Sequence, residues 1–260
     1  MYASRLFIFG ISCLTCVWLA GVANAAPARC EAGDAPSEAV SDQQALRSSS
    51  RPVDGLRDVH ANDRSALDEM LLGSRTAPLR WDRAPELVVL MPVLQYEQGR
   101  GTEYRATVER LSDQEATQLE ADLSRALAVL TDNTFEGFST VRRESVAAGE
   151  VVNVMRPGQI VVARYDGVRD QLATIGFGGR STRGSIIRAG SIILDNDFDR
   201  DNETRGLLRM HELGHALGYN HVLSRSSIMN PKIGPSPTDF DRTAARIAFH
   251  GFPVDASSCS

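Results

Sequence analysis

The chain has 260 residues, of which 42% are hydrophobic and 23% are charged. A chain of this length and composition can bury a core and is not expected to be disordered as a whole. Its formal net charge of −5 excludes a global basic field, so we expect no nucleic-acid partner.

The first 25 residues predict a secretory signal peptide. Arg5 supplies a positive charge, the uncharged stretch 6–23 follows it, and Ala23-Asn24-Ala25 is a small-residue cleavage site. The alternative is an uncleaved anchor, since an uncharged stretch of this length can just span a bilayer. No later stretch is long and apolar enough to do so. We therefore expect cleavage after Ala25, a secreted or periplasmic location, and no membrane partner thereafter.

Residues 26–80 predict a poorly ordered N-terminal extension or prosegment. Ala, Ser, Arg and Asp dominate this stretch, and residues 48–52 (SSSRP) are typical of a solvated linker. A short helix is expected within it at 64–72, ended by Gly73. The composition changes at Trp81, so we expect the main domain to span residues 81–255.

The main domain predicts strands and helices in alternation, with Pro92 marking an edge or a bulge in the first strand. Ser112 and Glu115 have the spacing of a capping box and predict the start of a long helix. The expected strands are 86–96, 138–146, 159–165, 171–177, 185–188 and 191–195, with a glycine-rich turn at 176–179. The expected helices are 112–130, 203–217 and 239–250. This order predicts an α+β fold in which a twisted mixed sheet carries the long helix.

Residues 211–221 read HELGHALGYNH, which is the pattern H-E-x-x-H-x-x-G-x-x-H. On a helix, His211 and His215 lie four residues apart and face the same way. Gly218 permits the left-handed turn that ends the helix and brings His221 back as a third ligand. Three protein ligands leave a fourth position open, which is the arrangement of a catalytic zinc site. The alternative is a surface helix with solvated histidines, but three of the chain's five histidines lie within this segment.

The residue that follows the first histidine predicts the chemistry of the site. Zinc lowers the pKa of a bound water to about 7. Glu212 lies beside the first ligand, where it can take the proton from that water and pass it to a leaving amine. The other residues between the histidines on the helix carry no titratable group.

Met229 lies eight residues after His221, in the segment 226–231 (SSIMNP). This segment resembles the Met-turn of the metzincin metalloproteases, and residues 81–253 resemble the catalytic domain of matrixin-like metzincins. The resemblance implies a metzincin-like fold with a zinc-site helix and a small C-terminal lobe that ends in a helix. It also implies endopeptidase action on polypeptides. The residues carried over are the zinc ligands His211, His215 and His221, the catalytic base Glu212 and the supporting Met229.

The acidic run before the motif leaves two interpretations open. Asp195, Asp197, Asp199 and Asp201 alternate along it, and carboxylates at such spacing can bind Ca²⁺. The alternative is a solvated acidic loop, which the dipole of the following helix favours.

The cysteines also leave two interpretations open. Removal of the signal peptide leaves Cys30 and Cys259, and two cysteines in an exported protein predict a disulfide. The segment 27–34 (PARCEAGD) also loosely resembles the cysteine switch of matrixin prosegments, in which a thiolate blocks the zinc.

We therefore predict an exported zinc-dependent endopeptidase whose partner is a polypeptide substrate. One alternative is a catalytically silent, zinc-containing binding module of the same fold, and another is a zinc hydrolase that acts on a non-peptide substrate. We expect the substrate to pair by β-augmentation with an edge strand at 185–188, and residues 222–237 to determine specificity.

Overall fold

The computed structural model of the chain describes residues 61–250. The expected signal peptide, Cys30 and Cys259 lie outside these residues. In chain order the elements are α2 (Ala61–Leu71), β1 (Glu86–Leu90), β2 (Pro92–Gln95), β3 (Glu103–Arg110), α3 (Asp113–Leu130), β4 (Val141–Glu144), β5 (Val151–Asn153), β6 (Gln159–Asp166), α4 (Val168–Leu172), β7 (Gly176–Arg183), β8 (Ile186–Asp195), α5 (Asn196–Asp201), α6 (Arg205–Leu217) and α7 (Asp239–His250). Within the described residues, no helix combines the length and the apolar character that crossing a membrane requires.

The strands form one mixed, curled sheet. Four of them run parallel in the order β4-β1-β6-β8, and β7 lies antiparallel beside β8. β2 follows β1 in the chain and pairs in parallel with the end of β6. β3 pairs antiparallel with β2, and β5 pairs antiparallel with β3. The pairing register of β2 shifts between Pro92 and Leu94, so the bulge expected at Pro92 is present. The predicted α+β architecture with a mixed sheet is therefore confirmed.

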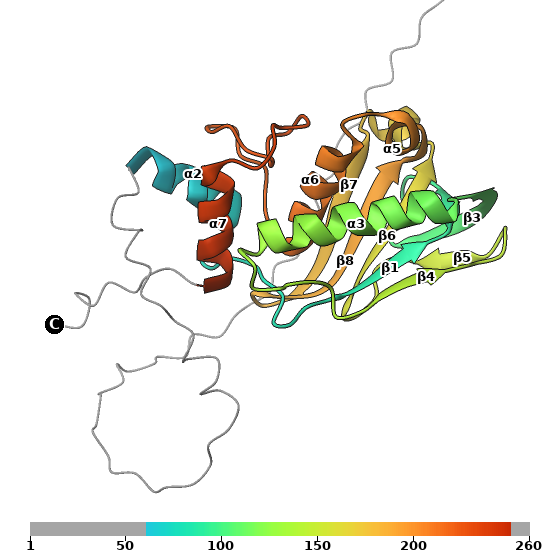
Figure 1. The fold of residues 1–260 in the computed structure, drawn as a ribbon, viewed down its shortest axis with the longest axis horizontal. Helices are drawn as coiled ribbons and strands as arrows, with labels where there is room; N and C mark the ends of the chain where they lie inside the picture. Colours follow the sequence, from blue (N-terminus) through green and yellow to red (C-terminus); the bar gives the residue numbers. More distant parts are fainter. Residues whose placement is uncertain (1–60, 251–260) are drawn as a thin grey trace, which may run out of the picture. The chain divides into compact units, whose positions relative to one another are not determined.

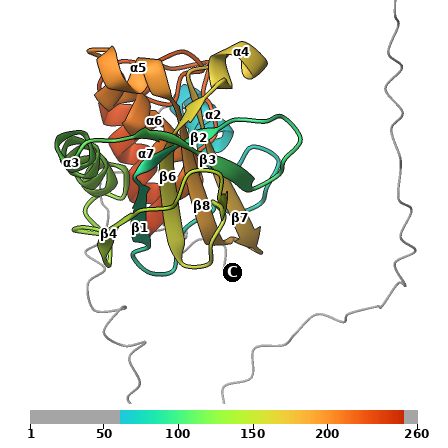
Figure 2. The same ribbon diagram turned by 90° about the vertical axis from the view of Figure 1, so that its right-hand side faces the viewer.

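Each face of the sheet has its own hydrophobic cluster. In β6, Ile160 and Val162 belong to the cluster beneath α3 and α6, and the residues next to them belong to the other cluster, as the period-2 alternation of a strand requires. α3 and α6 lie on the first face (Figure 1). The β2–β3 ribbon folds over the second face (Figure 2). This second cluster includes Tyr96, Tyr104 and Tyr165.

Helix α3 begins and packs as the sequence predicts. The Ser112 hydroxyl accepts a hydrogen bond from the Glu115 backbone N–H at 3.2 Å, and the Glu115 carboxylate accepts one from the Ser112 N–H at 2.8 Å. This reciprocal pair is the expected capping box. The buried residues of the helix are Ala116, Leu119, Leu123, Ala126, Leu127 and Leu130.

Several local predictions between residues 168 and 201 are wrong. The segment expected as a strand at 171–177 instead contains the end of α4, and the expected glycine-rich turn is the start of β7. The two strands expected at 185–188 and 191–195 are one continuous strand, β8. The acidic run is not a loop but the short helix α5, because the Asp195 carboxylate caps it by accepting a hydrogen bond from the Phe198 N–H.

Residues 61–80 are part of the folded body, although their composition predicts an extension. The helix expected at 64–72 is present as α2, which contacts α7 (Figure 1). Arg80 forms a parallel bridge with Ile186 of β8. The buried residues of α2, which join the main hydrophobic cluster, are Ala66, Leu67, Met70 and Leu71. The boundary expected at residue 80 therefore does not separate this segment from the rest of the fold.

Candidate metal centre

Helix α6 carries two of the three motif histidines, and its C-terminus determines where the third one lies. Gly218 caps the helix with a φ of +115°, in the region that favours glycine. A Cβ at this position would also lie 2.8 Å from the Leu79 carbonyl oxygen. The Tyr219 N–H donates to the Gly214 carbonyl at 3.0 Å, so the chain reverses tightly and returns toward the helix at His221.

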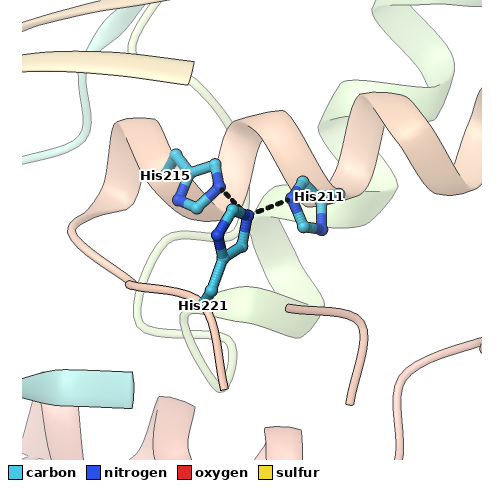
Figure 3. Close-up of side chains that lie close together, drawn as sticks. All are labelled: His211, His215 and His221. Atoms are coloured by element: carbon cyan, nitrogen blue, oxygen red, sulfur yellow. Dashed lines mark hydrogen bonds between the residues drawn. The ribbon is translucent and has the colours of Figure 1, made fainter. Parts of the chain in front are cut away.

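The three histidines converge on one point. His221 Nε2 lies 3.2 Å from His211 Nε2 and 3.1 Å from His215 Nε2 (Figure 3). Among the described residues, these three form the one group of His, Cys, Asp or Glu side chains that could hold a metal ion. Nitrogen ligands bound tetrahedrally at about 2.0–2.1 Å from one ion lie roughly 3.3 Å apart, so the observed spacing fits such an ion.

Backbone carbonyl groups determine the tautomers of two of these rings. His211 Nδ1 lies 2.7 Å from the Ile228 carbonyl oxygen, and His215 Nδ1 lies 2.9 Å from the Tyr219 carbonyl oxygen. A carbonyl oxygen only accepts, so each Nδ1 carries the proton and donates it. Each Nε2 is then the unprotonated nitrogen of a neutral ring, which is the form that binds metals.

Burial also favours the neutral form of the histidines. Burial lowers the pKa of His211, and neighbouring His221 lowers it further. Burial, together with the neighbouring His211, lowers the pKa of His215 to about 3. Partial burial also lowers the pKa of His221, although this residue is the exposed one of the three. Neutral imidazoles whose lone pairs point at one another are the donor set of a divalent cation such as zinc.

Glu212 is a buried carboxyl group beside the three histidines. Its side chain is on α6 and only 4% of the residue is exposed. Burial raises its pKa to about 8, although a hydrogen bond with the backbone of Gly178 acts in the opposite direction. Its Oε2 is buried and has no hydrogen-bond partner among the described residues. A buried acid with an unsatisfied oxygen and a shifted pKa is typical of a functional group in an active site.

The histidines and Glu212 line one side of an open cleft of about 760 Å³. The other walls come from residues 172–177, which lead into β7, and from residues 231–233. These walls are mainly apolar, and Arg169 and Lys232 contribute positive charge. The cleft therefore combines a ligand set for a cation, a potential proton acceptor and room for a substrate.

Met229 is fully buried next to the helix that carries the first two histidines. A Cβ on Gly214 would overlap its sulfur, so Met229 packs directly against the turn between His211 and His215. The neighbouring Ile228 carbonyl holds the ring of His211, and the Ile228 N–H donates to buried Asp241 of α7 at 3.2 Å. The Met229 segment thus supports the ring of His211.

Sequence reasoning did not identify several residues that shape this centre. Gly176 and Gly178 of β7 lie so close to α6 that a Cβ on Gly178 would overlap the Glu212 carbonyl oxygen. Glycines inside a strand signal such a close approach, but a run of glycines also favours the turn expected from the sequence. Arg180, further along β7, donates to the His215 carbonyl oxygen at 2.8 Å. Asp241 was also missed, although Thr238 and Asp241 show the spacing of a cap.

The four aspartates of the acidic run are matched by arginines. Asp199 is fully buried and lies between two guanidinium groups. The arginine partners are Arg169 for Asp195, Arg200 for Asp197 and Asp201, and Arg164 and Arg209 for Asp199. The carboxylates therefore act as structural partners of the arginines, and this arrangement does not favour Ca²⁺ binding.

Comparison with the models of known protein families finds no match, and comparison with curated proteins finds none either.

Proposed function

We propose that the protein is an exported, zinc-dependent endopeptidase of the metzincin class, with a matrixin-like catalytic domain. The observation that carries the proposal is the convergence of His211, His215 and His221 beside the buried, unsatisfied carboxyl of Glu212. The buried Met229 beneath the histidines is the supporting residue that the metzincin resemblance implies.

The three Nε2 atoms would hold the ion, and the protein's own groups would move the proton. Zinc bound there would supply a Lewis acid that polarises the scissile carbonyl and acidifies the attacking water. The positive charge of such an ion would also lower the pKa of Glu212, because a nearby opposite charge favours the carboxylate. Glu212 Oε2 then accepts the proton of the attacking water and returns it to the leaving amine.

An edge strand beside the cleft supports a polypeptide substrate. The expected edge strand at 185–188 is not free, because these residues pair with β7 and the Ser185 carbonyl and Ile187 N–H bond with Arg80. Within the described part of the chain, β7 pairs only with β8, and its first residues line the cleft. β7 is therefore the strand along which an extended polypeptide would add by β-augmentation.

The test is casein digestion by the full-length protein produced in zinc-replete medium, with zinc measured on the same sample. The expected result is one zinc per chain and cleavage that a chelator abolishes. Glu212→Gln preserves the shape of the side chain and removes the base, so it should keep its zinc and lose at least about 10²–10⁴-fold in kcat. His215→Ala should lose both the zinc and the activity.

Each contrary result points to a different conclusion. Wild-type protein without zinc, or equal cleavage by Glu212→Gln, contradicts the proposal. Zinc-loaded protein that hydrolyses small esters but not peptides indicates a hydrolase for another substrate. Zinc-loaded protein that cleaves neither indicates a catalytically silent binding module.

A further inference from the structure

The third histidine lacks the support that the other two receive. His211 and His215 each donate their Nδ1–H to a backbone carbonyl, but His221 Nδ1 has no such partner among the described residues. His221 is also exposed. The position of the His221 ring must therefore depend on the backbone around it. We call this segment, residues 218–225, the ligand loop.

Helix α2 holds the ligand loop at the residue that precedes His221. The Asn220 N–H donates to the Met70 carbonyl oxygen at 2.8 Å, and the Asn220 side-chain amide donates to the same oxygen at 3.1 Å. Met70 lies in the last turn of α2, where helix carbonyls lack partners within the helix. The loop and the end of the helix therefore satisfy each other.

The same helix holds the ligand loop on the other side of His221. One carboxylate oxygen of Glu69 accepts the Leu223 N–H at 3.1 Å, and the other accepts the Ser224 hydroxyl at 3.1 Å. Six residues earlier, nearly two helical turns back, Asp63 pairs with Arg225 at 2.6 Å. α2 thus contacts the loop both before and after the third ligand.

Arg180 of β7 connects the ligand loop to helix α6. Its guanidinium donates to the His215 carbonyl oxygen at 2.8 Å and to the Asn220 side-chain oxygen at 3.0 Å. Asn220 is therefore bonded to α2 through its amide N–H groups and to Arg180 through its oxygen. The relative placement of His215 and His221 depends on these shared contacts.

We propose that α2 positions the third metal ligand and that Glu69 is its positioning residue. The proposal rests on the proposed function only in requiring that the three histidines bind a metal. Partners of this kind typically contribute about 10–100-fold in metal affinity when they orient a ligand. Glu69 contacts none of the three histidines and acts through the Leu223 backbone N–H and the Ser224 hydroxyl.

The test measures Co²⁺ binding by the full-length protein, because the visible absorption of Co²⁺ reports how many ligands surround it. Glu69→Ala should weaken Co²⁺ binding about 10–100-fold and shift the absorption spectrum toward that of His221→Ala. Glu69→Gln keeps one acceptor and should fall between Glu69→Ala and wild type. The matched control is Asp68→Ala, which removes the same charge from the exposed neighbouring position and should equal wild type.

A second variant covers the case in which Glu69→Ala does not fold, as judged by far-UV circular dichroism. Ser224→Ala removes one of the two hydrogen bonds to Glu69 at an exposed position and should weaken Co²⁺ binding about fivefold. If folded Glu69→Ala binds Co²⁺ with the affinity and spectrum of wild type, this proposal is overturned and the proposed function is not. If Glu69→Ala does not fold, the same result in Ser224→Ala overturns it. Wild-type protein that binds no Co²⁺ overturns the proposed function as well.

Discussion

Gly178 lies where β7 crosses the helix that carries the histidines. A Cβ added there would overlap the Glu212 carbonyl oxygen and lie 2.6 Å from His215 Cβ. Gly178→Ala must therefore push β7 away from α6, and we expect a loss of about 1–3 kcal/mol in the free energy of unfolding, as for other overpacked positions. Urea denaturation monitored by tryptophan fluorescence measures this loss.

Gly137→Ala is the matched control for this substitution. A Cβ at Gly137 would meet nothing within 4 Å, and its backbone does not adopt a left-handed conformation. The alanine should leave stability unchanged or raise it by about 0.4–1 kcal/mol, because it restricts the unfolded chain. Equal stability of the two variants would show that β7 does not press on α6 as described.

His215 could be recognised from its local sequence pattern, whereas the role of Gly178 depends on a contact with a distant part of the chain. The histidine spacing is a local property of one helix and its C-terminal turn, so the sequence alone predicted the convergence of all three rings. The role of Gly178 depends on Glu212 and His215, which follow it by more than thirty residues. Glycines there are equally compatible with a turn until the partner of the strand is known.

At the scale of elements, the start of α3 carries a charge-dependent contribution to stability. Burial alone would raise the pKa of Glu115, but hydrogen bonds from Ser112 and Arg164 outweigh it and lower the pKa from 4.5 to about 2. A depressed folded-state pKa means that the ionised form stabilises the fold above about pH 4.5. This contribution is lost as the pH falls from about 4.5 to about 2.

Replacement of Glu115 by Gln tests this contribution. The free energy of unfolding of Glu115→Gln should lie below that of wild type at pH 6, and the difference should shrink as the pH approaches 2. Urea titrations at several pH values measure it. Glu136→Gln makes the same change at an exposed site and should stay within about 0.5 kcal/mol of wild type. A difference for Glu115→Gln that does not vary with pH would contradict the assignment.

Helices α2 and α3 show that a helix can be predicted from local sequence more readily than the residues against which it packs. The capping box of α3 is encoded by neighbouring residues and is present, and α2 ends at Leu71, one residue before the expected end and shortly before Gly73. That α2 belongs to the folded body could not be predicted, because its partners in the ligand loop lie about 150 residues later. The stretch around α2 is rich in Ala, Ser, Arg and Asp, which indicates an extension. Four buried side chains of α2 and its contacts with the ligand loop nevertheless attach the helix to the domain.

At the scale of the whole molecule, buried Asp199 joins several layers. It accepts hydrogen bonds from Arg164 of β6 and from Arg209 of α6, and both arginines are almost fully buried. Asp199→Ala would leave these cations short of a partner, so we expect a loss of about 3–5 kcal/mol in the free energy of unfolding. Asp197→Ala, at an exposed position of the same helix, should change it by less than about 0.5 kcal/mol. If urea denaturation shows equal losses for Asp199→Ala and Asp197→Ala, the two buried ion pairs of Asp199 do not stabilise the fold in this way.

The long separation between α2 and the ligand loop also determines the order in which the molecule can assemble. The chain is synthesised from its N-terminus, so α2 emerges long before the histidines that it would position. Closing a loop of about 150 residues costs more entropy than forming the local helices. The sheet and α6 can therefore form while His221 is still unplaced. On this view, any metal ion that the three histidines bind is captured in one of the last steps of folding, after most of the fold has formed.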